Sequence, residues 1–586
     1  MSSFGLHHKK RLLVLLFLVN IILLLLIFRV GWIQIVDGDK YRNLAQMQHT
    51  RDTLIPAERG QIFDRNGKAL ALSATAYTVW ARPIEIIGSG KEGEIALELA
   101  KILNKSEDEI KQKILDEKAN LVKVEKWIDT EKANLIRKGK FSGVWVVEDN
   151  KRYYPYGNFA AHILGHTTED NRGLTGVELE YDKYLSGLPG RMIRSTDARG
   201  TQLPYDSEKY YKPENGLNVV LTIDEVIQNH VEKAIDKALT ETKAKRVMAI
   251  VMEPKTGDIL AMAATPGYDP NNAKEPIGEL EKKQYENADS KEKQKIWNEM
   301  WRNPLISDTY EPGSTFKVIT AAAGLEEGVV EPNSQFYDSG YIVVAGQKLK
   351  CWRYYNPHGE QTFTQALENS CNPIFVEVGQ RLGKDKYYEY LEAFGFTKPT
   401  GIDLPGETKA ITQSKDKVGP VELATISYGQ GISVTPLQLI NAISAIGNDG
   451  KLMRPRIVKE LVDDSGNVIQ RFEPKIVRQV LSEKTAKELQ LMMESVVTNG
   501  SGKSAYIPGY RVGGKTGTAD KIVNGRYAEG KVYSSFVALA PVENPAFAVL
   551  VIVDEPQGEH FGSLTAAPAV YDILSESLRY ASIESE

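Results

Sequence analysis

The stretch that decides the fold is Glu311-Pro312-Gly313-Ser314-Thr315-Phe316-Lys317, near the middle of the chain. Its proline–glycine pair interrupts any preceding element, and the apolar run 318–325 predicts a helix directly afterwards. Ser314 then lies in the first helical turn, and Lys317 projects from the same face. A partly desolvated lysine can take the proton of a neighbouring serine hydroxyl, and a helix N-terminus offers N–H groups to an oxyanion. We therefore expect a Ser/Lys nucleophile pair here.

The same spacing occurs twice more, at Ser290–Lys293 and at Ser414–Lys417. Both copies lie in runs dense with charged residues, which are typical of solvated faces. Only Ser314 combines a preceding glycine with a following apolar helix. The context, and not the spacing alone, singles out this copy.

Composition limits the classes of protein that the chain can belong to. A length of 586 residues predicts two or more domains, and 42% hydrophobic residues can form a sizeable core. A net charge of −5 gives no indication of a nucleic-acid partner. Two cysteines, Cys351 and Cys371, do not predict a disulfide framework.

The N-terminal region predicts a membrane anchor. Residues 12–28 form an uncharged run of 17 residues, and an extension to Trp32 gives an anchor over 12–32. Basic residues in the stub 1–11 place the N-terminus in the cytoplasm by the positive-inside rule, with the rest of the chain outside. The competing interpretation is a cleaved signal peptide. Since no small-x-small cleavage site follows, we favour the uncleaved anchor.

Residues 33–215 predict a first extracytoplasmic domain with both helices and strands. Residues 39–53 indicate a helix, Asn66-Gly67 indicates a hairpin turn, and 69–82 continue as a strand. His162 and His166 have a spacing that suits a metal, but no acidic or cysteine ligand accompanies them in sequence. We therefore predict no metal site in this chain.

A composition shift at 212–216 begins a second large domain, residues 216–586. The pattern predicts a strand at 217–223, a helix at 225–242 and a strand pair at 247–253 and 258–264. Separated runs of strands and helices indicate an α+β layer structure.

Two further groups can complete a site around Ser314. Ser370-Cys371-Asn372 offers a hydroxyl and an amide two residues apart, which could shuttle a proton and orient a ligand. Lys515-Thr516-Gly517-Thr518 offers a lysine and two hydroxyls that could hold a carboxylate, and its glycine allows close backbone approach.

Other segments spell similar motifs. Lys255-Thr256-Gly257 precedes the serine on a predicted hairpin turn, and 465–467 (SGN) lies in a turn between strands. The segment 499–504 (NGSGKS) is similar to a nucleotide-binding loop but follows a helix instead of a strand. We interpret all three as structural.

In this order, Ser-x-x-Lys, Ser-x-Asn and Lys-Thr-Gly resemble the motif set of the penicillin-binding transpeptidases. Their separations, 56 residues (314 to 370) and 145 residues (370 to 515), are similar to those of that family. The chain also resembles class B members, on the division and sporulation branch that includes the stage V sporulation proteins. The segments that carry this resemblance are 59–65 (RGQIFDR), 176–178 (GVE), 310–314 (YEPGS) and 428–436 (YGQGISVTP).

The resemblance implies an α+β fold in which one transmembrane helix is followed by an elongated α/β pedestal of the dimerisation type. A transpeptidase domain with an antiparallel sheet flanked by helices completes it. It implies that Ser314 attacks the penultimate D-Ala carbonyl of a peptidoglycan stem peptide and that Lys317 takes its proton. Ser370, with Lys515 nearby, protonates the leaving D-Ala, and Asn372 orients the substrate.

For the remaining groups, the resemblance implies that the N–H groups of Ser314 and Thr518 form the oxyanion hole. Thr516 and Thr518 hold the substrate carboxylate beside Gly517. No cofactor is implied. β-Lactams, the membrane, a glycan polymerase and other cell-wall assembly proteins are the implied partners.

Two other functions stay open at this stage. One is a D,D-carboxypeptidase or β-lactamase, although no Glu-x-x-x-Asn context for activating water lies between the second and third motifs. The other is a membrane-anchored scaffold or β-lactam sensor for a cell-wall polymerase. Stable adduct formation with a β-lactam and the effect of Ser314→Ala on growth distinguish them.

The two cysteines allow two interpretations. They can be unrelated small residues. Alternatively, Cys351 and Cys371 form a reversible disulfide that would distort Ser370 and Asn372, which would make activity depend on the redox state outside the membrane.

Overall fold

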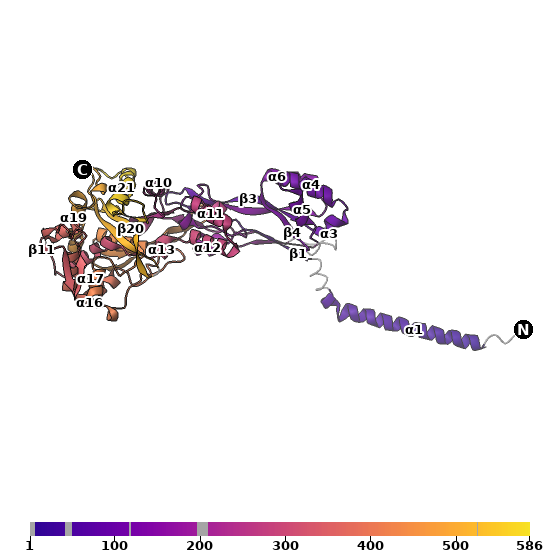
Figure 1. The fold of residues 1–586 in the computed structure, drawn as a ribbon. Coiled ribbons are helices and arrows are strands. Elements are labelled where there is room, and N and C mark those ends of the chain that lie inside the picture. The colour runs from indigo at the N-terminus through magenta and orange to yellow at the C-terminus, as the bar shows by residue number, and fades with distance from the viewer. Residues whose placement is uncertain (1–5, 42–49, 117–118, 196–208, 524, 586) are drawn as a thin grey trace. The chain divides into compact units, whose positions relative to one another are not determined.

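The computed structural model describes residues 6–41, 50–116, 119–195, 209–523 and 525–585 (Figure 1). The chain divides into two compact units. The first comprises 1–57 and 187–214, and the second comprises 58–186 and 215–586. The boundary that we predicted at 215/216 remains a prediction, because the larger unit draws on residues from both sides of it.

The smaller unit contains the N-terminal helix α1 (Leu6–Ile35) and a three-stranded antiparallel sheet. The sheet has the order β1 (Thr50–Ile55), β6 (Gly190–Ser195), β7 (Lys209–Tyr211). The 28-residue span His8–Ile35 is apolar enough to cross a membrane, and none of it is buried. The prediction of a helix over 39–53 is wrong at its C-terminal end, because Thr50–Ile55 is a strand that pairs with β6. Residues 42–49 of that prediction lie outside the described residues.

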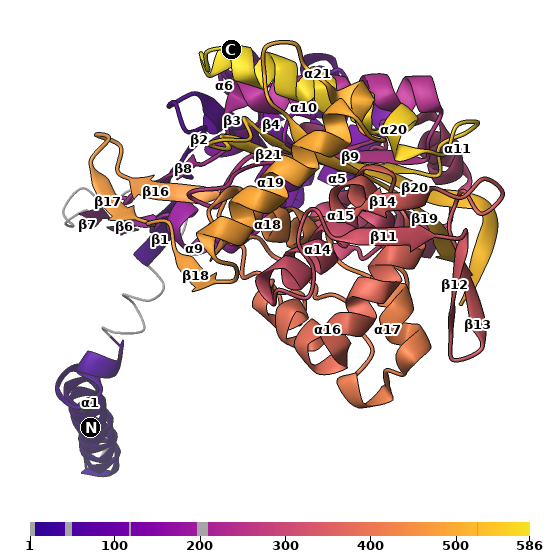
Figure 2. The same cartoon turned by 90° about the vertical axis from the view of Figure 1, so that its left-hand side faces the viewer.

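The larger unit is built around a five-stranded antiparallel sheet, as predicted (Figure 2). Its order is β10 (Asp258–Thr265), β9 (Arg246–Glu253), β21 (Phe547–Asp554), β20 (Arg526–Ala540), β19 (Gly513–Val523). All eight residues of β21 are buried, which explains its continuous apolar sequence. Strand β19 forms one edge of this sheet.

Alternate residues of the sheet contribute to two different cores, as the two-residue period of a strand requires. On one face, Val549, Val551 and Val553 pack with α10 (Glu225–Thr242) and α21 (Ala567–Tyr580). On the other face, Leu550 and Ile552 pack with helices from the middle of the chain. These are α14 (Lys317–Glu326), α16 (Asn372–Ala393), α17 (Pro420–Ile426), α18 (Pro436–Gly447) and α19 (Glu483–Thr498).

A second sheet has seven strands and combines early and late segments of the larger unit. Its path is β17 (Val468–Arg471), β16 (Val458–Val462), β8 (Asn218–Leu221), β2 (Ile62–Phe63), β3 (Ala69–Ala81), β4 (Val122–Ile128), and β5 (Val144–Tyr153) pairs with β3. The hairpin predicted at Asn66-Gly67 is confirmed, since β2 and β3 pair antiparallel across it and Gly67 has a φ of 87°. A separate core lies under α4 (Glu92–Leu103), α5 (Glu107–Ile114) and α6 (Thr130–Gly139).

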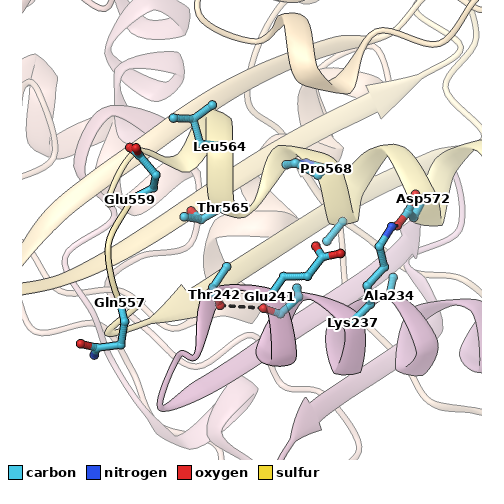
Figure 3. A pocket seen from close by; sticks show the side chains of 12 residues that line it. Ala234, Lys237, Glu241, Thr242, Gln557, Glu559, Leu564, Thr565, Pro568 and Asp572 are labelled. Atoms are coloured by element: carbon cyan, nitrogen blue, oxygen red, sulfur yellow. Dashed lines mark hydrogen bonds and ion pairs between the residues drawn. The ribbon is translucent and has the colours of Figure 1, made fainter.

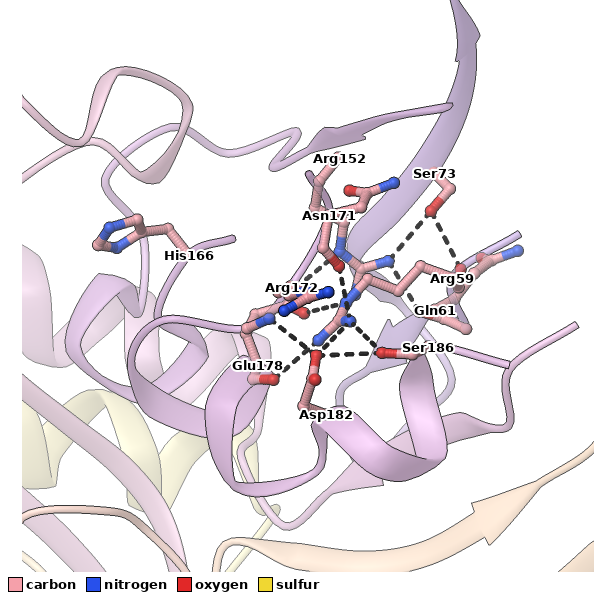
Figure 4. A network of polar contacts seen from close by, with 12 residues as sticks. Arg59, Gln61, Ser73, Arg152, His166, Asn171, Arg172, Glu178, Asp182 and Ser186 are labelled. Carbon is pink, nitrogen blue, oxygen red and sulfur yellow. Dashed lines mark hydrogen bonds and ion pairs between the residues drawn. The ribbon is translucent and has the colours of Figure 1, made fainter. Parts of the chain in front are cut away.

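A network of buried ion pairs joins residues between 59 and 182 of the larger unit (Figure 4). Glu178 accepts from Arg59 Nε and from Arg152 Nε, each at 2.6 Å, and all three side chains are buried. Asp182 takes a further donor of Arg59 at 2.6 Å. Arg59 and Glu178 belong to the RGQIFDR and GVE segments noted in the sequence. These segments therefore serve a structural network distant in sequence from Ser314.

The remaining elements are short helices, 3₁₀ turns and the strands of three two-stranded sheets. They are α3 (Pro83–Gly88), α7 (Ala161–Leu164), α8 (Gly176–Glu180), α9 (Asp182–Leu185), η1 (Pro270–Asn272), α11 (Glu279–Asn287), α12 (Ser290–Trp301), α13 (Pro304–Ser307), η2 (Gly313–Phe316), β11 (Gln335–Asp338), β12 (Tyr341–Val344), β13 (Gln347–Lys350), β14 (Gly359–Thr362), α15 (Phe363–Glu368), η3 (Lys415–Lys417), β15 (Lys451–Met453), β18 (Ile476–Gln479), η4 (Lys503–Ala505) and α20 (Gly562–Thr565).

Candidate active site

Ser314 lies in the 3₁₀ turn η2, and α14 begins only at Lys317, so the serine precedes the helix instead of opening it. The turn needs a glycine before the serine: Gly313 has a φ of 53°, and a Cβ there would lie 2.6 Å from Thr518 O. Gly313 N donates to Gly429 O at 3.0 Å. The YGQG segment therefore supports the turn that carries the serine.

Lys317 is fully buried beneath the half-buried Ser314. Its Nζ lies 3.0 Å from Ser314 Oγ, 3.1 Å from Ser370 Oγ and 2.6 Å from Asn372 Oδ1. It also donates to Ser370 O at 2.7 Å. No carboxylate among the described residues pairs with it, and burial lowers its pKa to about 7. A substantial fraction of Lys317 is thus neutral near neutral pH and can accept a proton.

Ser370 and Asn372 reach this lysine from the turn between α15 and α16. Ser370 has a φ of 54°, a left-handed conformation that costs a residue other than glycine roughly 1–2 kcal/mol. Such strain persists where the surrounding structure fixes it, and it is typical of functional sites. Asn372 is the first residue of α16, and its Nδ2 donates to Lys350 O at 3.3 Å.

Lys515 approaches Ser370 from the sheet edge β19. Its Nζ donates to Ser370 Oγ at 3.0 Å, and the side chain is fully buried. Burial, together with the nearby charge of Lys317, lowers the pKa of Lys515 well below its usual range. Lys515 Nζ also lies 3.3 Å from Thr516 Oγ1. Three segments that are far apart in sequence therefore converge on one hydroxyl.

The rest of the Lys-Thr-Gly segment lines the same edge. A Cβ on Gly517 would lie 2.8 Å from Pro312 O, so this glycine allows β19 to pass directly beside the serine turn. Thr518 is half-buried, and its Oγ1 accepts from Gly562 N at 3.3 Å. The predicted group from Ser314 to Thr518 is therefore assembled in one place.

Sequence reasoning missed one residue of this site, Ser501. It lies in the NGSGKS segment that we interpreted as a structural loop, and its Oγ is 3.2 Å from Thr516 Oγ1. No local signal marks Ser501. Its position depends on where α19 ends relative to β19, which is a tertiary property.

The competing motifs lie elsewhere. Ser290 and Ser414 are exposed, and Gly257 turns between β9 and β10 with a φ of 79°. His166 packs in the core with its Nδ1 3.3 Å from Tyr268 OH. Burial lowers the pKa of both His162 and His166 to about 4, so both are neutral core residues. Within the described residues, no third metal donor joins them.

Cys351 and Cys371 are both buried free thiols in this structure. The disulfide between them therefore remains a prediction. Cys371 lies directly between Ser370 and Asn372, so any bond that its sulfur makes affects the site.

A surface hollow between α10 and α21 is separate from these residues (Figure 3). It has a volume of about 190 Å³, and Lys237 and Asp572 on its wall form an ion pair of 2.8 Å. Neither the Ser314 group nor any residue bonded to it lines this hollow. It lies on the face of the sheet that packs with α10 and α21, whereas α14 and α16 pack with the opposite core.

Comparisons with known proteins identify the family of this chain. The family described as "Penicillin binding protein transpeptidase domain" matches residues 247–575, and the "Penicillin-binding Protein dimerisation domain" matches residues 54–221. Stage V sporulation protein D of Bacillus subtilis (strain 168) is 41% identical over 576 residues, covering 97% of this chain and 85% of the relative. Peptidoglycan D,D-transpeptidase FtsI of Escherichia coli (strain K12) is 32% identical over 567 residues, covering 96% and 90%.

Solved structures are similar along most of the chain. A peptidoglycan synthetase from Bifidobacterium adolescentis has a TM-score of 0.71 at 25% identity, covering 92% of this chain and 98% of that one. Penicillin binding protein 3 from Mycobacterium tuberculosis in complex with aztreonam has a TM-score of 0.68 at 26% identity, covering 91% and 98%.

Proposed function

This chain belongs to the class B penicillin-binding proteins and is a peptidoglycan D,D-transpeptidase, and from this premise we propose that Ser314 is its acylated nucleophile. The observation that carries the proposal is the 3.0 Å contact between Ser314 Oγ and Lys317 Nζ. Lys317 is buried, and no carboxylate among the described residues pairs with it. Ser314 is the half-buried member of the pair, so a substrate can reach its hydroxyl while the base stays dry.

Lys317 is the general base in this proposal. Neutral Lys317 takes the proton from Ser314 Oγ as the oxygen attacks the penultimate D-Ala carbonyl. Burial lowers the pKa of Lys317 to about 7, so it can accept a proton near neutral pH, where an ordinary lysine would be charged. The N–H groups of Ser314 and Thr518 stabilise the resulting oxyanion.

Ser370 completes the proton path to the leaving group. Its hydroxyl lies between Lys317 and Lys515, so it can pass a proton to the amine of the departing D-Ala. Asn372, held by Lys317 and by Lys350 O, orients the substrate amide. An amine from a neighbouring stem peptide then attacks the acyl-enzyme and forms the cross-link.

The edge strand β19 is the proposed platform for the donor peptide. An extended peptide can add to an open strand edge through main-chain hydrogen bonds. Thr516 and Thr518 then offer hydroxyls to its terminal carboxylate, beside the Nζ of Lys515, which lies 3.3 Å from Thr516 Oγ1. β-Lactams use the same site and acylate Ser314.

Ser314→Ala tests the assignment on the full-length protein in detergent. We expect complete loss of covalent labelling by a fluorescent penicillin, with unchanged thermal unfolding. Ser290→Ala, which removes the exposed serine of another Ser-x-x-Lys copy, is the matched control and keeps full labelling. Labelling of a folded Ser314→Ala protein, or a penicilloyl adduct mapped to another residue, would show the assignment to be wrong.

The helix α1 is the proposed membrane anchor. In this proposal, residues 1–11 form a cytoplasmic stub and residues 12–32 span the membrane. Residues 33–215 form the pedestal, and residues 216–586 form the transpeptidase domain. Support for the anchor comes from its apolar, unburied surface and from the basic residues before it. The N-terminus then lies in the cytoplasm and the active site outside. A C-terminal alkaline phosphatase fusion should be active in cells, and an inactive one would contradict this orientation.

Cross-linking needs glycan strands that another reaction supplies. We therefore propose a membrane glycan polymerase, with other cell-wall assembly proteins, as the partner of this chain. Affinity purification from cross-linked membranes should recover a polymerase with the full-length chain. In a control, residues 1–215 are exchanged for an unrelated anchor and domain. If the polymerase is recovered equally with this chimaera, residues 1–215 have no role in the contact.

A further inference from the structure

One exposed surface beside the active site is rich in aromatic side chains. It lies on the hairpin of β12 and β13 and on the turn 352–355 that follows (Figure 2). Trp352 is 49% exposed and Tyr355 is 73% exposed, and Tyr341 and Tyr354 are exposed as well. We call these four side chains the aromatic face. An exposed patch of this kind marks an interaction site, and none of its members takes part in the proposed acylation.

The hairpin buries one of its faces and exposes the other. On the inner face, Ile342 and its partner Leu349 pack against the main core. Successive residues of a strand point to opposite faces, so Tyr341 and its partner Lys350 point away from that core. The hairpin therefore presents Tyr341 to solvent in a direction that the packing of its inner face fixes.

Cations accompany the aromatic rings, and carboxylates do not. Residues 339–356 contain three basic residues and neither aspartate nor glutamate. Lys348 Nζ lies 3.6 Å from the centre of the Tyr341 ring, and Lys350 Nζ lies 4.6 Å from the centre of the Tyr354 ring. The surface therefore suits a ligand that combines apolar C–H faces with negative charge.

The aromatic face is joined to the turn between α15 and α16, which carries the second catalytic motif. Trp352 Nε1 donates to Asn369 O at 2.9 Å, and Asn372 Nδ2 donates to Lys350 O at 3.3 Å. The edge strand β19 reaches the same turn through Lys515, which donates to the serine of that motif at 3.0 Å. The turn therefore contacts both the proposed platform of the donor peptide and the aromatic face.

We propose that the aromatic face binds the acceptor strand of the cross-linking reaction, an inference that rests on the proposed function. The acceptor is a glycan strand with stem peptides, so it offers sugar rings and terminal carboxylates. Sugar C–H faces pack on the exposed rings through dispersion and the hydrophobic effect, and the carboxylates pair with Lys348 and Lys350.

This binding brings the acceptor amine to the acyl-enzyme from a side that the donor peptide on β19 leaves open. The amine nitrogen attacks the acyl carbonyl, so a C–N bond forms and the ester bond to Ser314 Oγ breaks. The proton that the amine loses returns to Ser314 Oγ. The aromatic face touches the strand and not the reacting atoms, so its residues determine which acceptor is used.

The direct test measures binding without acylation, on the full-length Ser314→Ala chain in detergent. Soluble, fluorescently labelled peptidoglycan strands without cross-links are titrated and followed by anisotropy. We expect Tyr355→Ala in this background to raise the Kd for the strands by about 5- to 10-fold. Lys348→Gln should also raise the Kd and should make binding less sensitive to salt.

Tyr571→Ala is the matched control, because Tyr571 is an exposed tyrosine on α21, which packs with the opposite core. It should leave the Kd unchanged. Strands that bind Tyr355→Ala and Tyr571→Ala equally well would overturn the proposal. So would strands that do not bind the Ser314→Ala chain at all.

A second experiment compares two acceptors in the otherwise unaltered chain. The acyl-enzyme formed from a thioester donor is released either by a free D-amino acid, which is too small to reach the aromatic face, or by the peptidoglycan strands. We expect Tyr355→Ala to lower the ratio of strand to D-amino acid aminolysis by about 5- to 10-fold, through a higher KM for the strands. An unchanged ratio would overturn the proposal.

The two proposals can fail separately. Covalent labelling of a folded Ser314→Ala chain by penicillin would contradict the assignment of the nucleophile. The Kd for the strands does not depend on which serine is acylated, so it decides the role of the aromatic face in either case.

Discussion

Lys317 and Lys515 donate to the same oxygen: Ser370 Oγ lies 3.1 Å from one Nζ and 3.0 Å from the other. Both lysines are fully buried. Burial lowers both pKa values, and for Lys515 the charge of Lys317 adds to the effect. Two neighbouring ammonium groups in a buried site repel each other. The lysine pair therefore favours a state with one positive charge instead of two.

Acylation should therefore depend on pH through Lys317. The neutral lysine is the base, and its pKa is lowered to about 7 by burial. We expect the second-order rate of penicillin acylation to rise by up to about tenfold per pH unit below this pKa, and to level off above it. Stopped-flow acylation across the neutral range measures this. A rate that falls as the pH rises through 7 would contradict the role.

The control for that profile is Lys317→Arg. Arginine keeps the positive charge but does not lose its proton in proteins, so it cannot act as the base. We expect loss of acylation at every pH in a protein that still folds. If Lys317→Arg retained the unaltered protein's rate, proton transfer to Lys317 would not be needed.

Gly517→Ala should separate the sheet edge from the serine turn. The added Cβ would lie 2.8 Å from Pro312 O, a backbone atom that cannot rotate away. A displacement of Ser314 by a fraction of an ångström to 1 Å predicts a loss of about 10- to 100-fold in acylation rate. Gly93→Ala is the matched control, because no atom lies near its Cβ. Equal acylation rates in the two variants would show that this close approach is not required.

Ser501→Ala tests the residue that only the structure revealed. Its hydroxyl is 3.2 Å from Thr516 Oγ1, and loss of one neutral hydrogen bond costs about 1 kcal/mol, or about fivefold in acylation rate. Ser504→Ala removes an exposed serine from the same segment and should have no effect. The comparison is the acylation rate at low β-lactam concentration. If both variants behave alike, Ser501 has no part in the site.

Glu178→Ala should destabilise the protein without touching the catalytic group. It leaves Arg59 and Arg152 buried with lost partners, which predicts a fall of about 3–5 kcal/mol in the free energy of unfolding. Asp572→Ala breaks the more exposed ion pair with Lys237 and should cost at most about 1 kcal/mol. Urea unfolding followed by tryptophan fluorescence compares them. Similar midpoints for the two variants would contradict a structural role for the network.

Much of the fold could be predicted because its signals are local. The strand pair around Gly257, the helix Glu225–Thr242 with its Asp224 cap and the strand that begins at Ala69 all follow from hydrophobic period, capping and turn residues. The expected helix over 39–53 was wrong at its C-terminal end. Its residues 50–53 pair with β6, more than a hundred residues away, and no local pattern records that partner.

The sequence by itself predicted three groups of the candidate site: Ser314 and Lys317, then Ser370 and Asn372, then Lys515 to Thr518. Each group is encoded within four residues, where spacing and context can be read directly. Only the tertiary structure decided that two lysines share Ser370 and that Ser501 joins Thr516. These contacts exist because distant sheet and helix segments pack together, and their distances depend on the packed core and not on any spacing along the chain.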